Sequence, residues 1–179
     1  KDIINRDGKL ARDLKTKRIR KSDGEMEYVV VFKRDTCCGY DIVIKESDIE
    51  NIKRSKGAIY SAASVLIKKF ELKFEDLGQI YIAGGFGTYL NINNAVSIGL
   101  LPDIDRSKFK FVGNSSLIGA REVLLSYDAM TKAEEIARKM AYIELSTDRS
   151  FMDEYVASLF FPHTDLERFP QSQKTIKRR

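Results

Sequence analysis

The most regular pattern in the chain is a stripe of apolar residues at helical spacing. From Asp48 to Phe70, hydrophobic positions recur every three or four residues, which predicts a long amphipathic helix whose stripe faces the core. Ser47 and Glu50 have the spacing of a capping box, in which each side chain bonds the backbone amide of the other residue. The stripe consists of Ile49, Ile52, Ile59, Ala63, Leu66, Ile67 and Phe70.

The segments before this helix predict a hairpin. Residues 1–24 carry turn signals and no sustained apolar period, so we expect them to be mostly loop. Residues 27–33 are β-branched and aromatic, and residues 41–44 form a second short apolar run, which favours two strands. Residues 34–39 have room for the loop that joins them.

After the long helix, the order strand, turn, helix occurs twice. A strand is predicted at residues 79–83 with a short helix at 91–98, and a second strand at 109–112 with a helix that continues to Leu125. Strands joined through helices pair in parallel with right-handed crossovers. We therefore expect the two strand ends to lie side by side, with their turns opening into the same groove.

The last third of the chain predicts more helix. We expect helices at residues 128–141 and 149–160, an edge strand at 142–145 between them, and an extended tail at 161–170. The fold class predicted by the whole pattern is α/β, a small mixed sheet flanked by helices.

Composition and charge narrow the class of protein. Of the 179 residues 43% are hydrophobic, as in ordinary globular proteins, and much of the net charge of +5 comes from segments 15–21 and 174–179. No stripe of Lys and Arg interleaved with aromatic residues crosses the folded part, so we expect no nucleic-acid partner. The sequence shows no signal peptide and no apolar run of membrane-spanning length, which favours a cytoplasmic protein without membrane contact.

Few residues suggest catalytic or metal chemistry. Cys37 and Cys38 are adjacent, a spacing that cannot form a zinc site or supply the four thiolates of an iron–sulfur cluster, so we expect no metal centre in this chain. His163 lacks a neighbouring Ser, Cys or metal-ligand pattern, and no catalytic residue can be assigned. The chain begins at Lys1 without a methionine, so we expect it to be part of a longer protein.

A glycine turn follows the first of the two predicted parallel strands. It consists of Gly84, Gly85, Phe86 and Gly87. Consecutive residues without a Cβ let a phosphate or ribose approach the backbone N–H groups, and ligands of open α/β sheets bind at this end of the strands. The pattern is neither a dinucleotide fingerprint nor a P-loop. A nucleotide site and a tight structural turn are about equally supported.

The second parallel strand ends in a similar turn, formed by Gly113, Asn114, Ser115 and Ser116. Free amides at the start of a helix from Leu117 form a natural anion site, to which either serine can add a hydroxyl. For a single turn of this kind, a serine that merely caps the helix is the simpler interpretation. Two such turns on neighbouring strands favour a shared nucleotide cleft.

Lys56 is the most informative single residue of the long helix. It lies within the apolar stripe, four residues after Ile52 and three before Ile59, where a charge is difficult to solvate. Two interpretations remain open. The ammonium reaches water or a carboxylate, or it contacts a nucleotide phosphate or the loops that hold it.

Five segments, taken together, are more specific to one protein family than any single motif. They are residues 56–59 (KGAI), 81–87 (YIAGGFG), 98–103 (IGLLPD), 111–120 (FVGNSSLIGA) and 160–165 (FFPHTD). Together, in consistent order over about residues 41–170, they resemble the C-terminal domain of the reductive activators of corrinoid proteins. That family includes the activators of methylamine and O-demethylase corrinoid methyltransferase systems.

The resemblance implies a fold and an activity. The fold is the ATP-binding fold of acetate and sugar kinases, heat-shock protein 70 and actin. In that fold two ribonuclease-H-like lobes close over the nucleotide. This chain looks like the second lobe. Residues 83–85 are similar to the adenosine motif of that superfamily, residues 113–120 resemble its following turn and helix, and residues 48–70 look like its connecting helix.

By the same resemblance, ATP hydrolysis drives an uphill electron transfer that returns the Co(II) corrinoid of a partner protein to Co(I). An iron–sulfur domain supplies the electron, and the other lobe holds magnesium. Neither is recognised in this chain, which therefore resembles at most half of an ATP site. We divide the chain into the end of a preceding segment (1–40), the ATP-binding lobe (41–170) and a basic tail (171–179).

Two other function classes stay open. A Rossmann-like enzyme needs an acidic residue at the end of the next strand, but the strand 109–112 ends in Gly113 and Asn114. A non-enzymatic docking or dimerisation module would show a large exposed apolar patch, and a homodimer is compatible with either class.

Overall fold

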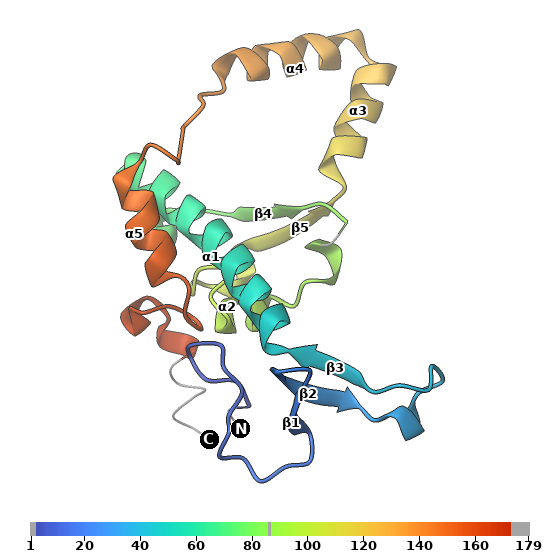
Figure 1. Cartoon of the computed structure of the whole chain (residues 1–179). Coiled ribbons are helices and arrows are strands. Elements are labelled where there is room, and N and C mark those ends of the chain that lie inside the picture. The colour runs from blue at the N-terminus through green and yellow to red at the C-terminus, as the bar shows by residue number, and fades with distance from the viewer. Residues whose placement is uncertain (1–2, 86, 173–179) are drawn as a thin grey trace.

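The computed structural model describes residues 3–85 and 87–172. Its described strands form a three-stranded antiparallel sheet and a two-stranded parallel sheet, with the long helix α1 (Glu46–Lys69) running between them (Figure 1). Helices and strands alternate after α1, which confirms the predicted α/β class.

The antiparallel sheet has the order β1 (Ile19–Ser22), β2 (Glu25–Val31) and β3 (Ile42–Lys45). The pairing of β2 with β3 confirms the predicted hairpin. Strand β1 lies where we expected loop. Asp23 and Gly24, both with positive φ, form the tight turn into β2, and such Asp-Gly turns match the twist of a hairpin.

Helix α1 begins two residues earlier than predicted, and its cap differs. The carboxylate of Asp48 accepts the amide N–H of Lys45 at 2.9 Å, so the predicted capping box of Ser47 and Glu50 is wrong. The Ser47 amide donates instead to Glu25 at 2.6 Å, and Glu50 pairs with Lys53. The hairpin thus supplies part of the cap.

The buried face of α1 shares only Ile49 with the predicted apolar stripe. Ile59 is 55% exposed, and Ile52 and Phe70 are also exposed, whereas Lys56 and Tyr60 are buried. The reason is that α1 packs against α5 (Arg149–Ala157) and against the segment that follows α5. Both cover the face of α1 that carries the more polar residues. Ile49, Lys53, Lys56, Gly57, Tyr60, Ser61, Ser64 and Val65 form the buried face.

The parallel sheet pairs β4 (Ile80–Ala83) with β5 (Phe109–Gly113), as the sequence predicts. Helix α2 (Ile92–Ser97) lies between them in sequence and is capped by the side chain of Asn91, which accepts the Asn94 amide N–H at 3.0 Å.

Helices α3 (Ser115–Leu125) and α4 (Tyr127–Lys139) contact each other and project from the rest of the domain (Figure 1). The predicted edge strand 142–145 is wrong, because this described segment pairs with no neighbouring strand and Tyr142 is exposed. Helix α5 ends at Ala157, earlier than the predicted residue 160.

The segment after α5 is folded rather than extended. Its residues His163 and Phe169 are buried, and Phe169 joins Tyr60 of α1 and Val96 of α2 in the core. The rings of Tyr60 and Phe169 lie 5.5 Å apart between centroids. Of the predicted basic tail, residues 173–179 lie outside the described residues. Short 3-10 helices occur at Lys33–Asp35, Phe74–Asp76, Gly87–Tyr89, Arg106–Lys108 and Leu166–Arg168.

Candidate functional site

The two glycine turns meet at the carboxyl edge of the parallel sheet. Ala83 and Gly113 are register partners, and the backbone N–H of Gly84 donates to the carbonyl oxygen of Gly113 at 2.7 Å. The predicted neighbourhood of the two turns is therefore confirmed. This edge is where open α/β folds bind ligands.

The backbone at these turns needs glycine at two positions. Gly84 has φ of +100° and Gly113 has φ of +65°, a region in which side chains with a Cβ are strained. A Cβ at Gly84, Gly85 or Gly113 would meet no described atom within 4 Å, so the space above the backbone is open. Gly87 differs, because its Cβ would lie 2.8 Å from Cγ2 of Ile82, which gives it a packing role.

Three of the predicted residues continue from Gly113 into α3. The helix begins at Ser115 rather than at Leu117, and Asn114 is its N-cap, accepting the Leu117 amide N–H at 3.1 Å. Ser115 and Ser116 therefore lie in the first turn, exposed. The first-turn amides and the positive end of the helix dipole lie beside the glycine turns and favour an anion. Phe86 lies outside the described residues.

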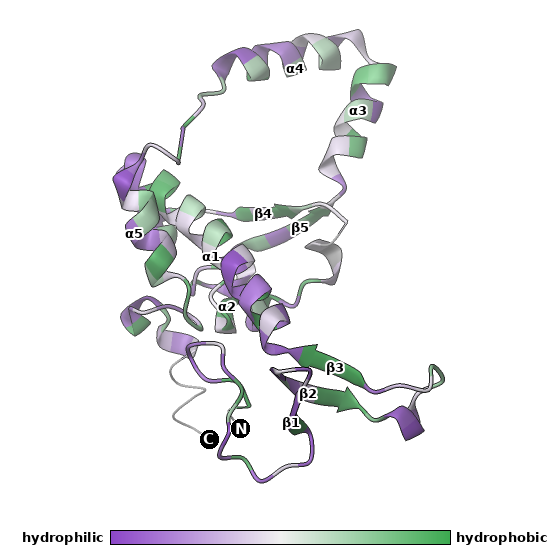
Figure 2. Ribbon diagram, in the orientation of Figure 1, coloured by the Kyte–Doolittle hydropathy of each residue, from purple (hydrophilic) through white to green (hydrophobic). Residues whose placement is uncertain are grey.

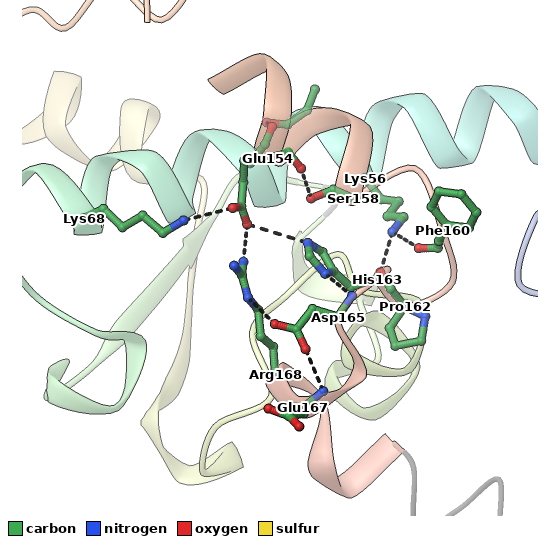
Figure 3. Close-up of polar contacts among 12 residues, drawn as sticks. Lys56, Lys68, Glu154, Ser158, Phe160, Pro162, His163, Asp165, Glu167 and Arg168 are labelled. Atoms are coloured by element: carbon green, nitrogen blue, oxygen red, sulfur yellow. Dashed lines mark hydrogen bonds and ion pairs between the residues drawn. The ribbon is translucent and has the colours of Figure 1, made fainter. Parts of the chain in front are cut away.

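Lys56 is buried as its position in the sequence suggests, but it has different partners from those considered. Its side chain donates to the carbonyl oxygen of Pro162 at 2.6 Å and to that of Phe160 (Figure 3). It is 1% exposed, so it does not reach water, and no carboxylate among the described residues forms an ion pair with it. Burial lowers the pKa of Lys56 to about 7, and repulsion from Lys53 acts in the same direction.

These contacts give Lys56 a structural role next to α5. The two carbonyl groups flank Phe161, whose ring centroid lies 5.5 Å from the lysine nitrogen. The ammonium thus fixes the chain where it leaves α5. The described contacts of Lys56 are with this segment, and the structure does not bring it together with the two glycine turns.

A buried charged cluster lies beside Lys56 and was not predicted. Glu154 of α5 is 6% exposed and receives Lys68 of α1 at 2.9 Å and the guanidinium of Arg168 (Figure 3). Burial by itself would raise the pKa of the Glu154 carboxyl, but the His163, Lys68 and Arg168 side chains together hold it well below its usual range. The cluster joins α1, α5 and the segment that follows α5.

His163 lies beside this cluster, and its Nε2 has no hydrogen-bond partner among the described residues. Its Nδ1 accepts the amide N–H of Asp165 at 2.9 Å, so the ring proton lies on Nε2. Nε2 faces a Glu154 oxygen 3.6 Å away, longer than a hydrogen bond. The only sequence signal for this arrangement was the FFPHTD segment, since each charged residue by itself is typical of a solvated helix face.

The described residues show neither a metal-binding group nor a membrane span. Residues 3–85 and 87–172 gather no cluster of three or more His, Cys, Asp or Glu side chains that could hold a metal ion. In the same ranges no helix combines the length and the apolar character that crossing a bilayer requires.

Comparisons with known proteins agree with the fold. The "Corrinoid activation enzyme RamQ" of Eubacterium limosum is 37% identical over 123 residues, which is 69% of this chain and 21% of that protein. The "[Co(II) methylated amine-specific corrinoid protein] reductase" of Methanosarcina barkeri is 32% identical over 125 residues, 69% of this chain and 23% of that protein. The chain thus spans less than a quarter of the length of these relatives.

A solved structure extends this likeness to nearly the whole chain. The "Reductive activator for corrinoid,iron-sulfur protein" has 48% sequence identity and a TM-score of 0.87, covering 94% of this chain and 27% of that one. Residues 1–173 match the family described as the C-terminal domain of RACo, the ASKHA domain. The chain therefore belongs to the family of C-terminal ASKHA domains of reductive activators of corrinoid proteins.

Proposed function

We propose that this chain is the ATP-binding C-terminal lobe of an ATP-dependent reductive activator, which returns the Co(II) corrinoid of a methyltransferase system to Co(I). The hydrogen bond that joins Gly84 to Gly113 carries the proposal, because it places two open glycine turns side by side at the edge where nucleotides bind. The similar proteins named as corrinoid activators supply the reaction class.

The lobe contributes backbone donors to the nucleotide. A Cβ at Gly84, Gly85 or Gly113 would meet open space, so a ribose or phosphate can approach this backbone without meeting a side chain. Ser115 and Ser116, in the first turn of α3, add amides and hydroxyls. Such fixed donors orient ATP and favour its negative charge.

The rest of the reaction needs groups beyond this chain. Phosphoryl transfer depends on a positioned metal ion and charge, and no metal cluster forms among the described residues. In the proposed protein a second lobe holds magnesium with ATP, and an iron–sulfur domain outside this chain donates one electron to Co(II). The corrinoid protein is the electron acceptor and partner.

Gly85 gives a direct test of the nucleotide site. Gly85→Val in the full-length protein places a branched side chain in the open space and should abolish measurable ATP binding in calorimetry, with unchanged thermal stability. Gly78→Val is the matched control, because Gly78 is also open to solvent but precedes β4 at the opposite end of the strand. Undiminished ATP affinity in folded Gly85→Val would contradict the proposal.

A docking role has its own supporting observation. Large apolar side chains are exposed on α3 and α4, as a contact surface requires. They include Leu117, Leu124, Leu125 and Tyr127. Sedimentation of the full-length protein with Leu124→Glu tests whether this surface forms a homodimer. A dimer that the substitution dissociates would support this role, and an unchanged oligomeric state would exclude it.

A further inference from the structure

The antiparallel sheet has one covered face and one apolar face open to solvent. Its register pairs Tyr28 with Ile44 and Val31 with Ile42, which places these four side chains on one face. Ile42 is 46% exposed there, whereas Val29, on the opposite face, is fully buried. Figure 2 shows β2 and β3 as apolar strands that lead to a hydrophilic segment at the hairpin end.

A cationic groove of about 590 Å³ lies beside the hairpin end. One carboxylate, Asp41, lines it. Asp41 already binds Arg20 at 2.8 Å, and Arg20 also binds Glu27 at 2.7 Å, so Arg20 adds no free positive charge to the groove. The cations that line the groove are Lys17, Arg18, Arg20, Lys33 and Arg34.

The remaining cations of this groove keep free charge. Arg18 donates to the carbonyl oxygens of Val29 and Val30 at 2.8 Å each, which positions it without neutralising it. Within the described ranges no carboxylate forms an ion pair with Lys17, Arg18 or Lys33. The side chain of Arg34 is 80% exposed, and among the described carboxylates it pairs only with the exposed Asp35, at 3.4 Å.

An aromatic ring holds two of the guanidinium groups in place. Arg18 lies 5.0 Å and Arg34 5.7 Å from the centroid of Phe32, distances at which cations are attracted to the ring face. Tyr40, 66% exposed, stands at the same hairpin end. Arginine, tyrosine and exposed aliphatic residues together are the composition of protein-binding surfaces.

We propose that this surface, formed by the groove and the outer face of β2 and β3, docks an acidic region of the corrinoid protein. The identity of the partner rests on the proposed function. Charge complementarity selects an acidic partner, and the aliphatic face requires apolar contact that a phosphate backbone cannot offer. Because guanidinium groups already lie against Phe32, its ring is also poorly available for stacking on nucleic-acid bases.

Charge reversal at Arg34 tests the docking surface. In the full-length protein, Arg34→Glu should raise the corrinoid-protein concentration for half-maximal reduction by about tenfold, with unchanged ATP affinity and unchanged maximal rate. Tyr40→Ser should act in the same direction. Arg149→Glu on the exposed start of α5 changes the net charge equally and is the matched control, which should behave as the wild type.

The two cysteines at the hairpin end report occupancy without any mutation. Cys37 and Cys38 are free and exposed, so maleimide should label them in the full-length protein, and saturating corrinoid protein should protect them. Mass spectrometry of the peptide resolves this labelling from that of other cysteines. Cysteines that resist labelling in the free protein would show that the remaining polypeptide covers this face, which would overturn the proposal.

The outcomes separate this inference from the proposed function. If the wild type binds ATP and reduces the corrinoid, and Arg34→Glu and Tyr40→Ser behave like the Arg149→Glu control, the docking surface is overturned and the proposed function stands. Wild-type protein that neither binds ATP nor reduces the corrinoid overturns the function and, with it, the partner named here. The inference is also overturned if Arg34→Glu weakens the binding of a single-stranded oligonucleotide but leaves the binding of the corrinoid protein unchanged.

Discussion

The backbone N–H of Gly84 donates to the carbonyl oxygen of Gly113 across the parallel pair of strands, at 2.7 Å. The bond extends the ladder by one step beyond the last residue of β4, and both glycines have positive φ where it forms. Two turns far apart in sequence are thereby held next to each other at the edge of the sheet.

Gly84 and Gly85 should respond differently to the same small substitution. Gly84→Ala forces a Cβ into positive φ and should destabilise the domain by about 1–2 kcal/mol. Gly85→Ala should leave stability unchanged, because its φ is not positive and its Cβ position is open. Thermal unfolding of both variants in the full-length protein measures the difference, and equal melting temperatures would contradict it.

The local elements around the candidate site could be predicted from the sequence. Short apolar runs followed by glycine predict the strands 79–83 and 109–112. The helix that connects these strands then predicts their parallel pairing. The hairpin of β2 and β3 followed from β-branched runs in the same way. These features depend on neighbours in sequence, which is why local patterns are sufficient.

Contacts between distant segments could not be predicted in this way. Ile59 of the predicted stripe is exposed while Lys56 of the same stripe is buried, because residues more than a hundred positions away decide which part of the helix is covered. The predicted strand 142–145 fails for a related reason, since an apolar run becomes a strand only beside a partner. Phe86 stays a predicted site residue outside the described structure.

Gly99 should tolerate no side chain. It has φ of +76°, and a Cβ there would lie 2.0 Å from the carbonyl oxygen of Pro162, which also accepts the Lys56 hydrogen bond. Gly99→Ala combines backbone strain with a clash against backbone, so it should cost more than about 2 kcal/mol. Thermal unfolding measures this cost, and a shift no larger than that of Gly78→Ala would refute the expectation.

Glu154→Gln should weaken the attachment of α5 to α1. The substitution removes the negative charge that Lys68 and Arg168 face. The free energy of unfolding should fall by about 1–3 kcal/mol, and not more, because Lys68 is half exposed and its ion pair is partly screened by water. Asp153→Asn, an exposed carboxylate of the same helix, is the control. Chemical denaturation at neutral pH measures both.

Acid should remove this difference between Glu154→Gln and the wild type. The pKa of Glu154 is lower in the folded chain than its ordinary value of 4.5, so its stabilisation is complete above pH 4.5 and is lost as the pH falls through the folded-state pKa. The free energies of unfolding should therefore converge at acidic pH. A difference independent of pH would show that Glu154 acts through packing.

Lys56→Met should lower stability while leaving nucleotide affinity intact. The variant keeps an apolar chain of similar length but leaves the buried carbonyl groups of Phe160 and Pro162 without a donor, at about 1–3 kcal/mol for each group. Removal of a poorly solvated charge offsets part of this loss at neutral pH. Lys132→Met, on exposed α4, is the control for loss of one positive charge.

The pH dependence identifies the buried ammonium as the cause. Burial lowers the pKa of Lys56 to about 7 against 10.5 in the unfolded chain, so between these values the unfolded chain binds more protons and stability rises with pH. Neutral Lys56 still donates to both carbonyl groups, so the wild type should gain on Lys56→Met as the pH is raised from 7 to 10.5. Chemical denaturation of both proteins over this window measures the gain. A constant difference would assign the effect to packing, and lost ATP affinity in a stable Lys56→Met protein would return Lys56 to the nucleotide site.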